Sequence, residues 1–143
     1  MKSPILVILG GTTQTISEPL KDAMERHRLD EDRIEFIQAH HWDYWSFPTE
    51  APFDDRELKG KFSAEPEHVS NHAIFVRNSP AEYTFSGVIC KDGSLIDLQD
   101  FGWRLIDEPS KSIDKAGKTW SVKLKALLAE NIEDIGVYVI VHC

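Results

Sequence analysis

The chain has 143 residues, a formal net charge of −8, and 41% hydrophobic and 28% charged residues. This composition is typical of an ordinary globular protein and excludes disordered, collagen-like and membrane-embedded chains. The length predicts a single domain over residues 1–143 with one hydrophobic core. The acidic balance argues against binding of duplex nucleic acid, which usually needs a basic face, but it still allows a small anion held by local backbone N–H groups.

The cysteines and the N-terminal segment bear on the compartment. Two cysteines, Cys90 and Cys143, are too few for a disulfide framework or a metal cluster. The first apolar run, Ile5 to Leu9, is too short for a signal-peptide core or a membrane span. We therefore expect a cytoplasmic protein without membrane contact and without a cofactor.

The first 26 residues predict a strand, a turn and a helix. Residues 5–9 form a continuous branched apolar run, which is typical of a strand covered on both faces in a parallel sheet. Two glycines follow, and from Ile16 the apolar positions have the spacing of an amphipathic helix. Thr15 to Glu18 fits a capping box with Thr15 as the N-cap, although Ser17 is an alternative cap because Pro19 suits the first turn of a helix.

The remaining chain predicts a mixed α/β organisation. Alternating residues 33–37 indicate a second strand, and residues 39–67 form a loop-rich segment with one short helix near Asp54 to Leu58. Residues 72–106 predict a β-rich insert, with strand-like runs at 73–76, 83–90, 95–98 and 103–106 and a hairpin turn at 91–94.

A later helix, marked by Trp120, Leu124, Leu127 and Leu128, precedes a second buried run at 135–141. We expect a single α/β domain whose mixed sheet has a parallel Rossmann-like core and an antiparallel β-rich insert.

The turn between the first strand and the first helix is the candidate ligand site. Backbone N–H groups converge beyond the carboxyl end of a parallel strand, so anions bind there readily. The turn also offers hydroxyl groups and an amide, and its residues are Gly10, Gly11, Thr12, Thr13, Gln14 and Thr15. The alternative is that a strand-to-helix connection simply needs glycine and a cap. Neither GxGxxG nor GxxxxGK[ST] occurs here, so the two standard nucleotide motifs are absent.

Leu9 to Leu20 resembles the first strand, turn and helix of CRISPR-associated Rossmann-fold (CARF) domains. In that family the segment often reads Leu-Gly-Thr-Thr-Pro-Gln, then two apolar residues, then Thr-Glu-x-Leu. Ala116-Gly117-Lys118-Thr119 is similar to a second family element, a small-residue turn with a basic residue and a threonine that opens a later helix. The resemblance covers residues 5–20 and, more weakly, residues 116–141.

This resemblance implies a homodimer that binds a cyclic oligoadenylate, a nucleotide second messenger of CRISPR antiviral defence, across its two-fold axis. It places Lys118 and Thr119 beside Thr12 and Thr13. Some standalone members of the family are also ring nucleases that open the ring without a metal. In such a reaction Lys118 would stabilise charge on the phosphate, the hydroxyl of Thr12 or Thr13 would position it, and His41 or its neighbour His40 would act as general acid or base.

Two further clusters have open interpretations. His40, His41 and Asp43 can bind metals, but adjacent histidines on a strand face opposite sides and no recognised spacing links them to His68 or His72, so no metal site is predicted. The aromatic residues Trp42, Tyr44, Trp45 and Phe47 could stack on bases, anchor a protein partner or pack in the core.

A second functional hypothesis comes from a different class of protein. A small, acidic, single-domain chain with exposed aromatic and acidic side chains also suits a non-catalytic inhibitor, such as a toxin-immunity or anti-defence protein. On this hypothesis the partner is a basic protein rather than a nucleotide.

Overall fold

The computed structural model describes residues 2–10, 15–27, 42, 44–50, 53–55, 58, 61, 65, 67–80, 84–97 and 113–142. The elements in chain order are β1 (Lys2–Leu9), α1 (Ser17–Arg26), β2 (Tyr44–Ser46), α3 (Glu67–Ser70), β3 (Ala73–Phe75), the 3-10 helix η2 (Val76–Asn78), β4 (Gly87–Ile89), β5 (Leu95–Asp97), α4 (Ile113–Glu130) and β6 (Ile135–His142).

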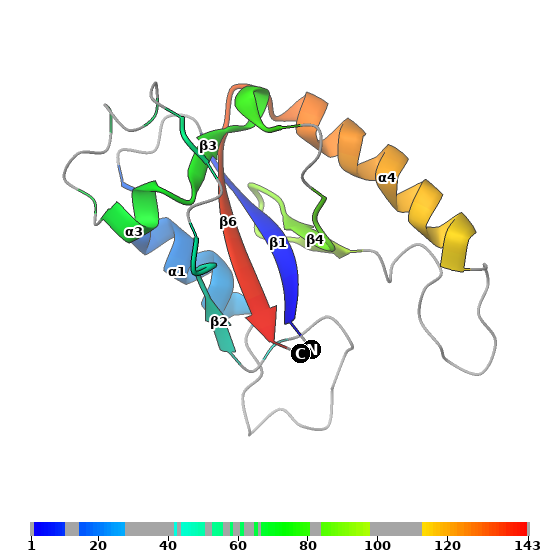
Figure 1. Ribbon diagram of the computed structural model, residues 1–143, viewed down its shortest axis with the longest axis horizontal. Coiled ribbons are helices and arrows are strands. Elements are labelled where there is room, and N and C mark those ends of the chain that lie inside the picture. The colour runs from blue at the N-terminus through cyan, green and yellow to red at the C-terminus, as the bar shows by residue number, and fades with distance from the viewer. Residues whose placement is uncertain are drawn as a thin grey trace.

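One mixed sheet organises the chain. Its strand order is β2-β6-β1-β4-β5. β3 pairs with the first part of β6, residues 135–137, and β2 pairs with the last part, residues 140–142. β1 runs parallel to β4, whereas the other pairs between described strands are antiparallel. The long pair β1–β6 extends from Lys2↔His142 to Leu9↔Ile135, which brings the two ends of the chain close together (Figure 1).

The expected mixed sheet is therefore confirmed, but its pairing differs in one respect from the expectation. The two long apolar strands near the ends of the chain are direct neighbours and antiparallel, and the parallel partner of β1 is the short strand β4.

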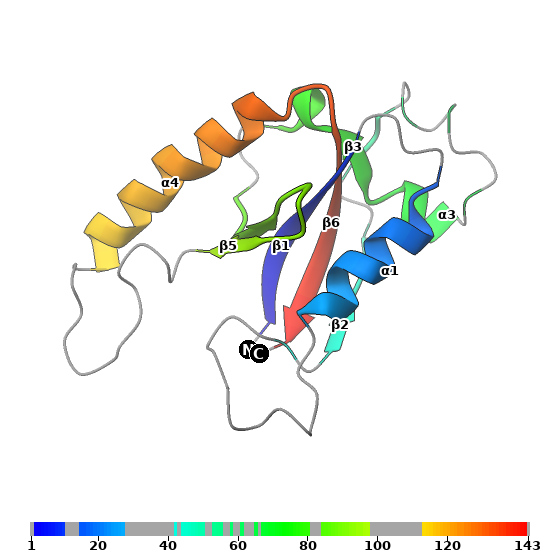
Figure 2. The same ribbon diagram turned by 180° about the vertical axis from the view of Figure 1, so that it is seen from behind.

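Side-chain alternation along β1 divides the core into two layers. Val7 and its odd-numbered neighbours pack with Leu20 and Met24 of α1, whereas Leu6 and Ile8 pack with α4. The two helices accordingly lie on opposite faces of the sheet, on either side of β1 and β6 (Figures 1 and 2). Each fully buried apolar side chain in these layers stabilises the fold by about 1.5–3 kcal/mol, because its surface is removed from water. A strand that is covered on both faces therefore consists mainly of apolar residues.

The predicted hairpin is confirmed. β4 and β5 pair from Gly87↔Asp97 to Ile89↔Leu95, and the Cys90 N–H donates to Ser94 O at 2.8 Å. Gly93 has φ +89°, a conformation that glycine adopts without a steric penalty. Asp92 accepts hydrogen bonds from the hydroxyl and the N–H of Ser94, and these bonds lower the pKa of Asp92.

The predicted turn at Ala116–Thr119 is wrong. These residues lie inside α4, which begins at Ile113. One glycine in a helix costs only about 1 kcal/mol. Burial of Trp120, Leu124 and Leu127 against the sheet offsets that cost.

The expected caps of α1 are also wrong. The helix begins at Ser17, its N-cap position is Ile16, and no side chain at that position forms a capping hydrogen bond. The capping acceptor is the carboxylate of Glu65: Oε1 accepts the Ile16 N–H at 2.8 Å, and Oε2 accepts the Ser17 hydroxyl. These bonds, the one from the Ser17 hydroxyl foremost, hold the pKa of Glu65 below its ordinary value. A rule based on neighbouring residues could not find an acceptor 49 residues away.

Other expectations are met in part or fall outside the described residues. Leu58 is helical and its N–H donates to Asp55 Oδ1 at 3.3 Å, as expected of a short helix near this position. The strands expected at 33–37 and 103–106 lie outside the described ranges. Within those ranges, no helix combines the length and the apolar character needed to cross a bilayer.

Candidate functional site

A cavity of about 210 Å³ lies where β1 and β4 end. Because these strands are parallel and Val7 pairs with Ile89, the residues that follow them emerge at the same edge of the sheet. This edge is where α/β folds usually bind ligands. The lining comes from the end of β1, from one side of α1 and from the β4–β5 turn: Ile8, Leu9, Gly10, Pro19, Asp22, Ala23, Arg26, Cys90, Lys91, Asp92 and Gly93.

Arg26 joins two walls of this cavity. Its Nη1 donates to the backbone O of Asp92 at 3.3 Å, so the guanidinium reaches from the end of α1 to the hairpin turn. The neighbouring His27 places Nε2 2.7 Å from Gly93 O, and this nitrogen must be the donor because a carbonyl can only accept. These two contacts hold the turn against the C-terminal end of α1.

The four charged groups of the lining differ in how they are paired. Lys91 Nζ forms an ion pair with Asp134 at 2.9 Å, and the Asp92 carboxylate is engaged by Ser94. Arg26 and Asp22 have no ion-pair partner in the part of the chain that the structure describes. Two exposed side chains of α1 in the lining therefore lack an ion-pair partner among the described residues: Asp22 and, one helical turn later, Arg26, whose hydrogen bond is to the backbone of Asp92.

Cys90 contributes a half-buried thiol to the lining. Burial raises the pKa of this thiol, and the hydrogen bond with Ser94 offsets only part of that effect. A thiol that stays protonated is a poor nucleophile. We therefore assign Cys90 a packing role in the cavity rather than a catalytic one.

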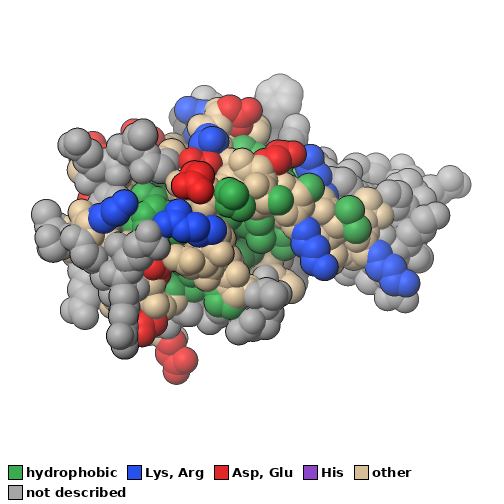
Figure 3. All heavy atoms as spheres, turned by 90° about the horizontal axis from the view of Figure 1, so that it is seen from above, with side chains coloured by type: hydrophobic (Ala, Val, Ile, Leu, Met, Phe, Trp, Pro, Cys, Tyr) green, Lys and Arg blue, Asp and Glu red, His purple; other side chains and the backbone are tan. Residues whose placement is uncertain are grey.

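The surface at this end of the molecule is mixed in charge. Figure 3 shows acidic, basic and apolar side chains interspersed across the face seen from above, without one dominant basic field. Any anion bound here would be held by local contacts rather than by the overall potential, which the net charge of −8 makes unfavourable.

The structure places only some of the predicted site residues near this cavity. Gly10 lines it, and Thr15 is exposed just before α1. Lys118 and Thr119 lie in α4, on the opposite face of the sheet from α1, and so do not follow a parallel strand as the resemblance implies. The other predicted residues lie outside the described ranges: Gly11, Thr12, Thr13, Gln14, His40 and His41.

The sequence analysis did not identify Arg26, Asp22 or Lys91 as site residues. Their one detectable signal was position: Asp22 and Arg26 are four residues apart on the helix that follows the candidate turn, and Lys91 opens the hairpin turn. Only the parallel pairing of β1 with β4 brings that hairpin turn beside the helix.

The aromatic residues divide between core and surface. Trp42 is buried at 1% exposure, whereas Tyr44 is 47% exposed and its ring stacks on His142 with centroids 4.7 Å apart. Trp45 and Phe47 are partly buried against the core layer of α1. Core packing is thus confirmed for Trp42, and Tyr44 is the member of this group that the surface presents.

The described histidines have structural contacts. His72 is buried, with Nδ1 2.6 Å from His68 O and Nε2 3.3 Å from Glu50 O, and its ring stacks on Phe47. His68 packs edge-on against the same Phe47 ring. Within the described ranges, no group of three or more histidine, cysteine or acidic side chains is arranged to hold a metal ion.

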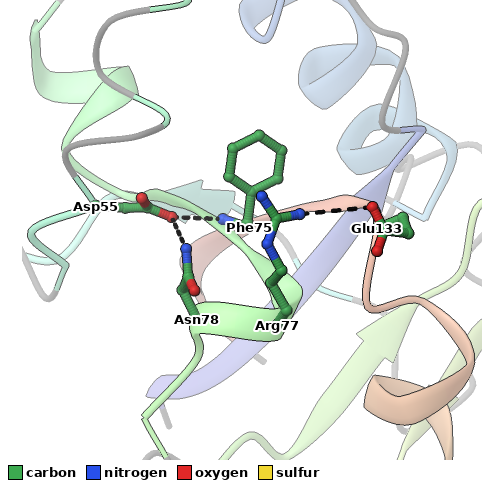
Figure 4. A network of polar contacts seen from close by, with 5 residues as sticks. All are labelled: Asp55, Phe75, Arg77, Asn78 and Glu133. Carbon is green, nitrogen blue, oxygen red and sulfur yellow. Dashed lines mark hydrogen bonds and ion pairs between the residues drawn. The ribbon is translucent and has the colours of Figure 1, made fainter.

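A second cavity, of about 190 Å³, lies beside Asp55 and Asn78. The buried Asp55 carboxylate accepts the Phe75 N–H at 2.9 Å and the Asn78 amide at 3.2 Å, in addition to the Leu58 N–H (Figure 4). Nearby, the Arg77 guanidinium lies 4.2 Å from the Phe75 ring centroid and pairs with Glu133. These donors satisfy the buried carboxylate, so its role is to join the 53–58 segment to β3.

No family model matches this chain, and no curated protein or solved structure is significantly similar to it. The functional argument therefore depends on the geometry of the cavity at the ends of β1 and β4.

Proposed function

We propose that this chain is a CARF-like binding protein for a cyclic oligoadenylate or a related nucleotide second messenger, and that a phosphate of the ligand binds Arg26. The observation that carries the proposal is the Arg26 guanidinium, which has no ion-pair partner among the described residues and lines the same cavity as Gly10, at the carboxyl ends of two parallel strands. Arg26 is the last residue of α1, so its side chain, and not the N–H groups at the start of the helix, would hold the phosphate.

The chemistry of the guanidinium favours phosphate. Arginine offers planar paired donors that match two oxygens of a phosphate, and hydrogen bonds between charged groups are roughly twice as strong as neutral ones. The present contact of Arg26, a 3.3 Å bond to Asp92 O, uses one of these donors at a long distance. Most of its donor capacity is therefore open to a ligand.

Two finer parts of the proposal follow from the CARF resemblance. The segment from β1 through α1, with β4 as the parallel neighbour of β1, supports a Rossmann-like core at this edge of the sheet. A homodimer would present two equal cavities to a ring whose adenylate units repeat, so that each copy binds an equivalent phosphate.

Ring opening would need roles different from those that the sequence implied. A ribose 2′-hydroxyl would attack the neighbouring phosphorus, and the bond from phosphorus to the 5′-oxygen would break. Charge on the phosphate would then be stabilised by Arg26 rather than Lys118, because α4 packs on the other face of the sheet. Thr12 remains the proposed positioning hydroxyl and His41 the proposed proton-transfer group.

The test is calorimetric titration with cyclic tetra-adenylate and cyclic hexa-adenylate, followed by chromatography of the mixtures for ring-opened product. We expect one of the rings to bind, and we expect Arg26→Gln to weaken binding by about tenfold or more, because hydrogen bonds to charged groups contribute about 1.5–3 kcal/mol. Lys21→Gln is the matched control, since Lys21 is an exposed cation of α1 outside the cavity lining. Absence of binding to both rings, or equal binding by the Arg26 variant, would overturn the proposal.

A further inference from the structure

The exposed carboxylate of Asp22 lies in the lining of the site proposed for an anion. It lies in the same cavity lining as Arg26, one helical turn earlier on α1, and the two side chains do not form an ion pair with each other. A lone carboxylate would repel a phosphate unless the ligand also offered hydrogen-bond donors to it. Asp22 and Arg26 together therefore favour a ligand in which a phosphate lies close to a hydrogen-bond donor.

The spacing of the two groups limits how far apart those features can be. Positions i and i+4 on a helix are neighbours, with about 5–6 Å between their Cβ atoms. The 2′-hydroxyl of a ribose and a phosphate attached to the same ribose are separated by a similar distance. In a ring linked through 3′- and 5′-oxygens the 2′-hydroxyl is the ribose hydroxyl that stays free, and it can donate to a carboxylate oxygen.

The size of the cavity limits the ligand further. At about 210 Å³ it is smaller than the pockets of roughly 300–1,000 Å³ that enclose drug-sized ligands. It therefore has room for part of one nucleotide and not for a ring of several. Its apolar lining, from Ile8, Leu9 and Pro19, offers the carbon skeleton of a sugar something to pack against.

We infer that Asp22 and Arg26 together recognise one ribose-phosphate unit, with Arg26 on the phosphate and Asp22 on the ribose 2′-hydroxyl group. This inference rests on the proposed function and deepens it, because it makes Asp22 the residue that distinguishes ribonucleotides from deoxynucleotides. The rest of a cyclic ligand would lie outside the cavity.

Two monomeric probes test this assignment: adenosine 5′-monophosphate and its 2′-deoxy analogue, each titrated into the full chain. We expect the unmodified protein to bind the ribonucleotide about tenfold more tightly, as a hydrogen bond to a charged acceptor predicts. Asp22→Asn should reduce this preference to less than twofold without weakening binding of the deoxy analogue. Arg26→Gln should weaken both. Glu25→Gln, at an exposed carboxylate of α1 outside the lining, should leave the preference intact.

The location is checked through Cys90. In a Cys143→Ser background, saturating ribonucleotide should slow alkylation of Cys90 by iodoacetamide, because the thiol lines the same cavity. Equal binding of the two monophosphates, unchanged preference in Asp22→Asn, or no protection of Cys90 would each overturn the inference. If neither monophosphate binds but a cyclic oligoadenylate does so through Arg26, the inference fails and the proposed function stands. If no adenylate binds at all, both fail.

Discussion

The guanidinium of Arg26 lies across Gly93, so closely that a Cβ atom at position 93 would be 1.7 Å from Nη1. The two residues are joined as well by the bond from Arg26 to the adjacent Asp92 O, which spans 66 residues of sequence. This contact fixes the hairpin turn against α1 and forms one wall of the cavity.

We predict that Gly93→Ala destabilises the protein. With φ at +89°, any side chain at this position is strained, which costs roughly 1–2 kcal/mol, and the new methyl group would also displace the Arg26 side chain. The free energy of unfolding in urea should fall by that amount. An unchanged midpoint with an unchanged slope would contradict the glycine requirement.

Gly117 is the control for Gly93, because the same substitution to alanine should stabilise the protein there. It lies within α4, and a Cβ built there meets nothing within 4 Å. Gly117→Ala should therefore raise the free energy of unfolding by about 0.5–1 kcal/mol, because alanine restricts the unfolded chain and favours the helix. A loss of stability would show that Ala116–Thr119 does not form part of a helix in solution.

Glu65 should stabilise the start of α1 in a pH-dependent way. Its pKa is lowered in the folded protein from an ordinary value of 4.5, so its contribution is fully present above that pH. The contribution is lost as the pH falls through the lowered pKa, since a protonated carboxyl is a weaker acceptor for Ile16 and Ser17.

Glu65→Ala should cost about 1 kcal/mol at pH 7, as loss of an N-cap acceptor does. The difference in unfolding free energy between the two proteins should be constant from pH 7 to pH 5 and should shrink as the pH is lowered below 4.5. If the difference in unfolding free energy between the two proteins grew as the pH fell, the capping role of Glu65 would be refuted.

Two buried tryptophans provide a matched test of a hydrogen bond. Trp120 Nε1 donates to Phe85 O at 2.7 Å, whereas Trp42 Nε1 is buried and has no hydrogen-bond partner among the described residues. Each substitution to phenylalanine removes similar volume, but only Trp120→Phe leaves a carbonyl without its donor. We expect Trp120→Phe to cost about 1–3 kcal/mol more than Trp42→Phe in denaturant unfolding. Equal costs would contradict this.

The elements most predictable from sequence were those with a strong local pattern. The apolar runs of β1 and β6, the 3.6-residue spacing from Trp120 to Leu128 and the Asp92-Gly93 turn each indicated the element that the structure contains. Gly10 lines the cavity, and its part in ligand binding stays a prediction. In each case the signal lay within about ten residues of the feature it predicted.

The remaining features depend on contacts between distant segments. The sequence alone determined that Ile5 to Leu9 forms a buried strand and that an amphipathic helix follows it, because burial leaves a local pattern of apolar residues. Only the tertiary structure decided that β1 pairs in parallel with β4, that Glu65 caps α1, and that Arg26 meets the turn after β4. Strand pairing and side-chain contacts over 49 or 66 residues are set by how the whole chain packs, and no periodicity in the sequence records them.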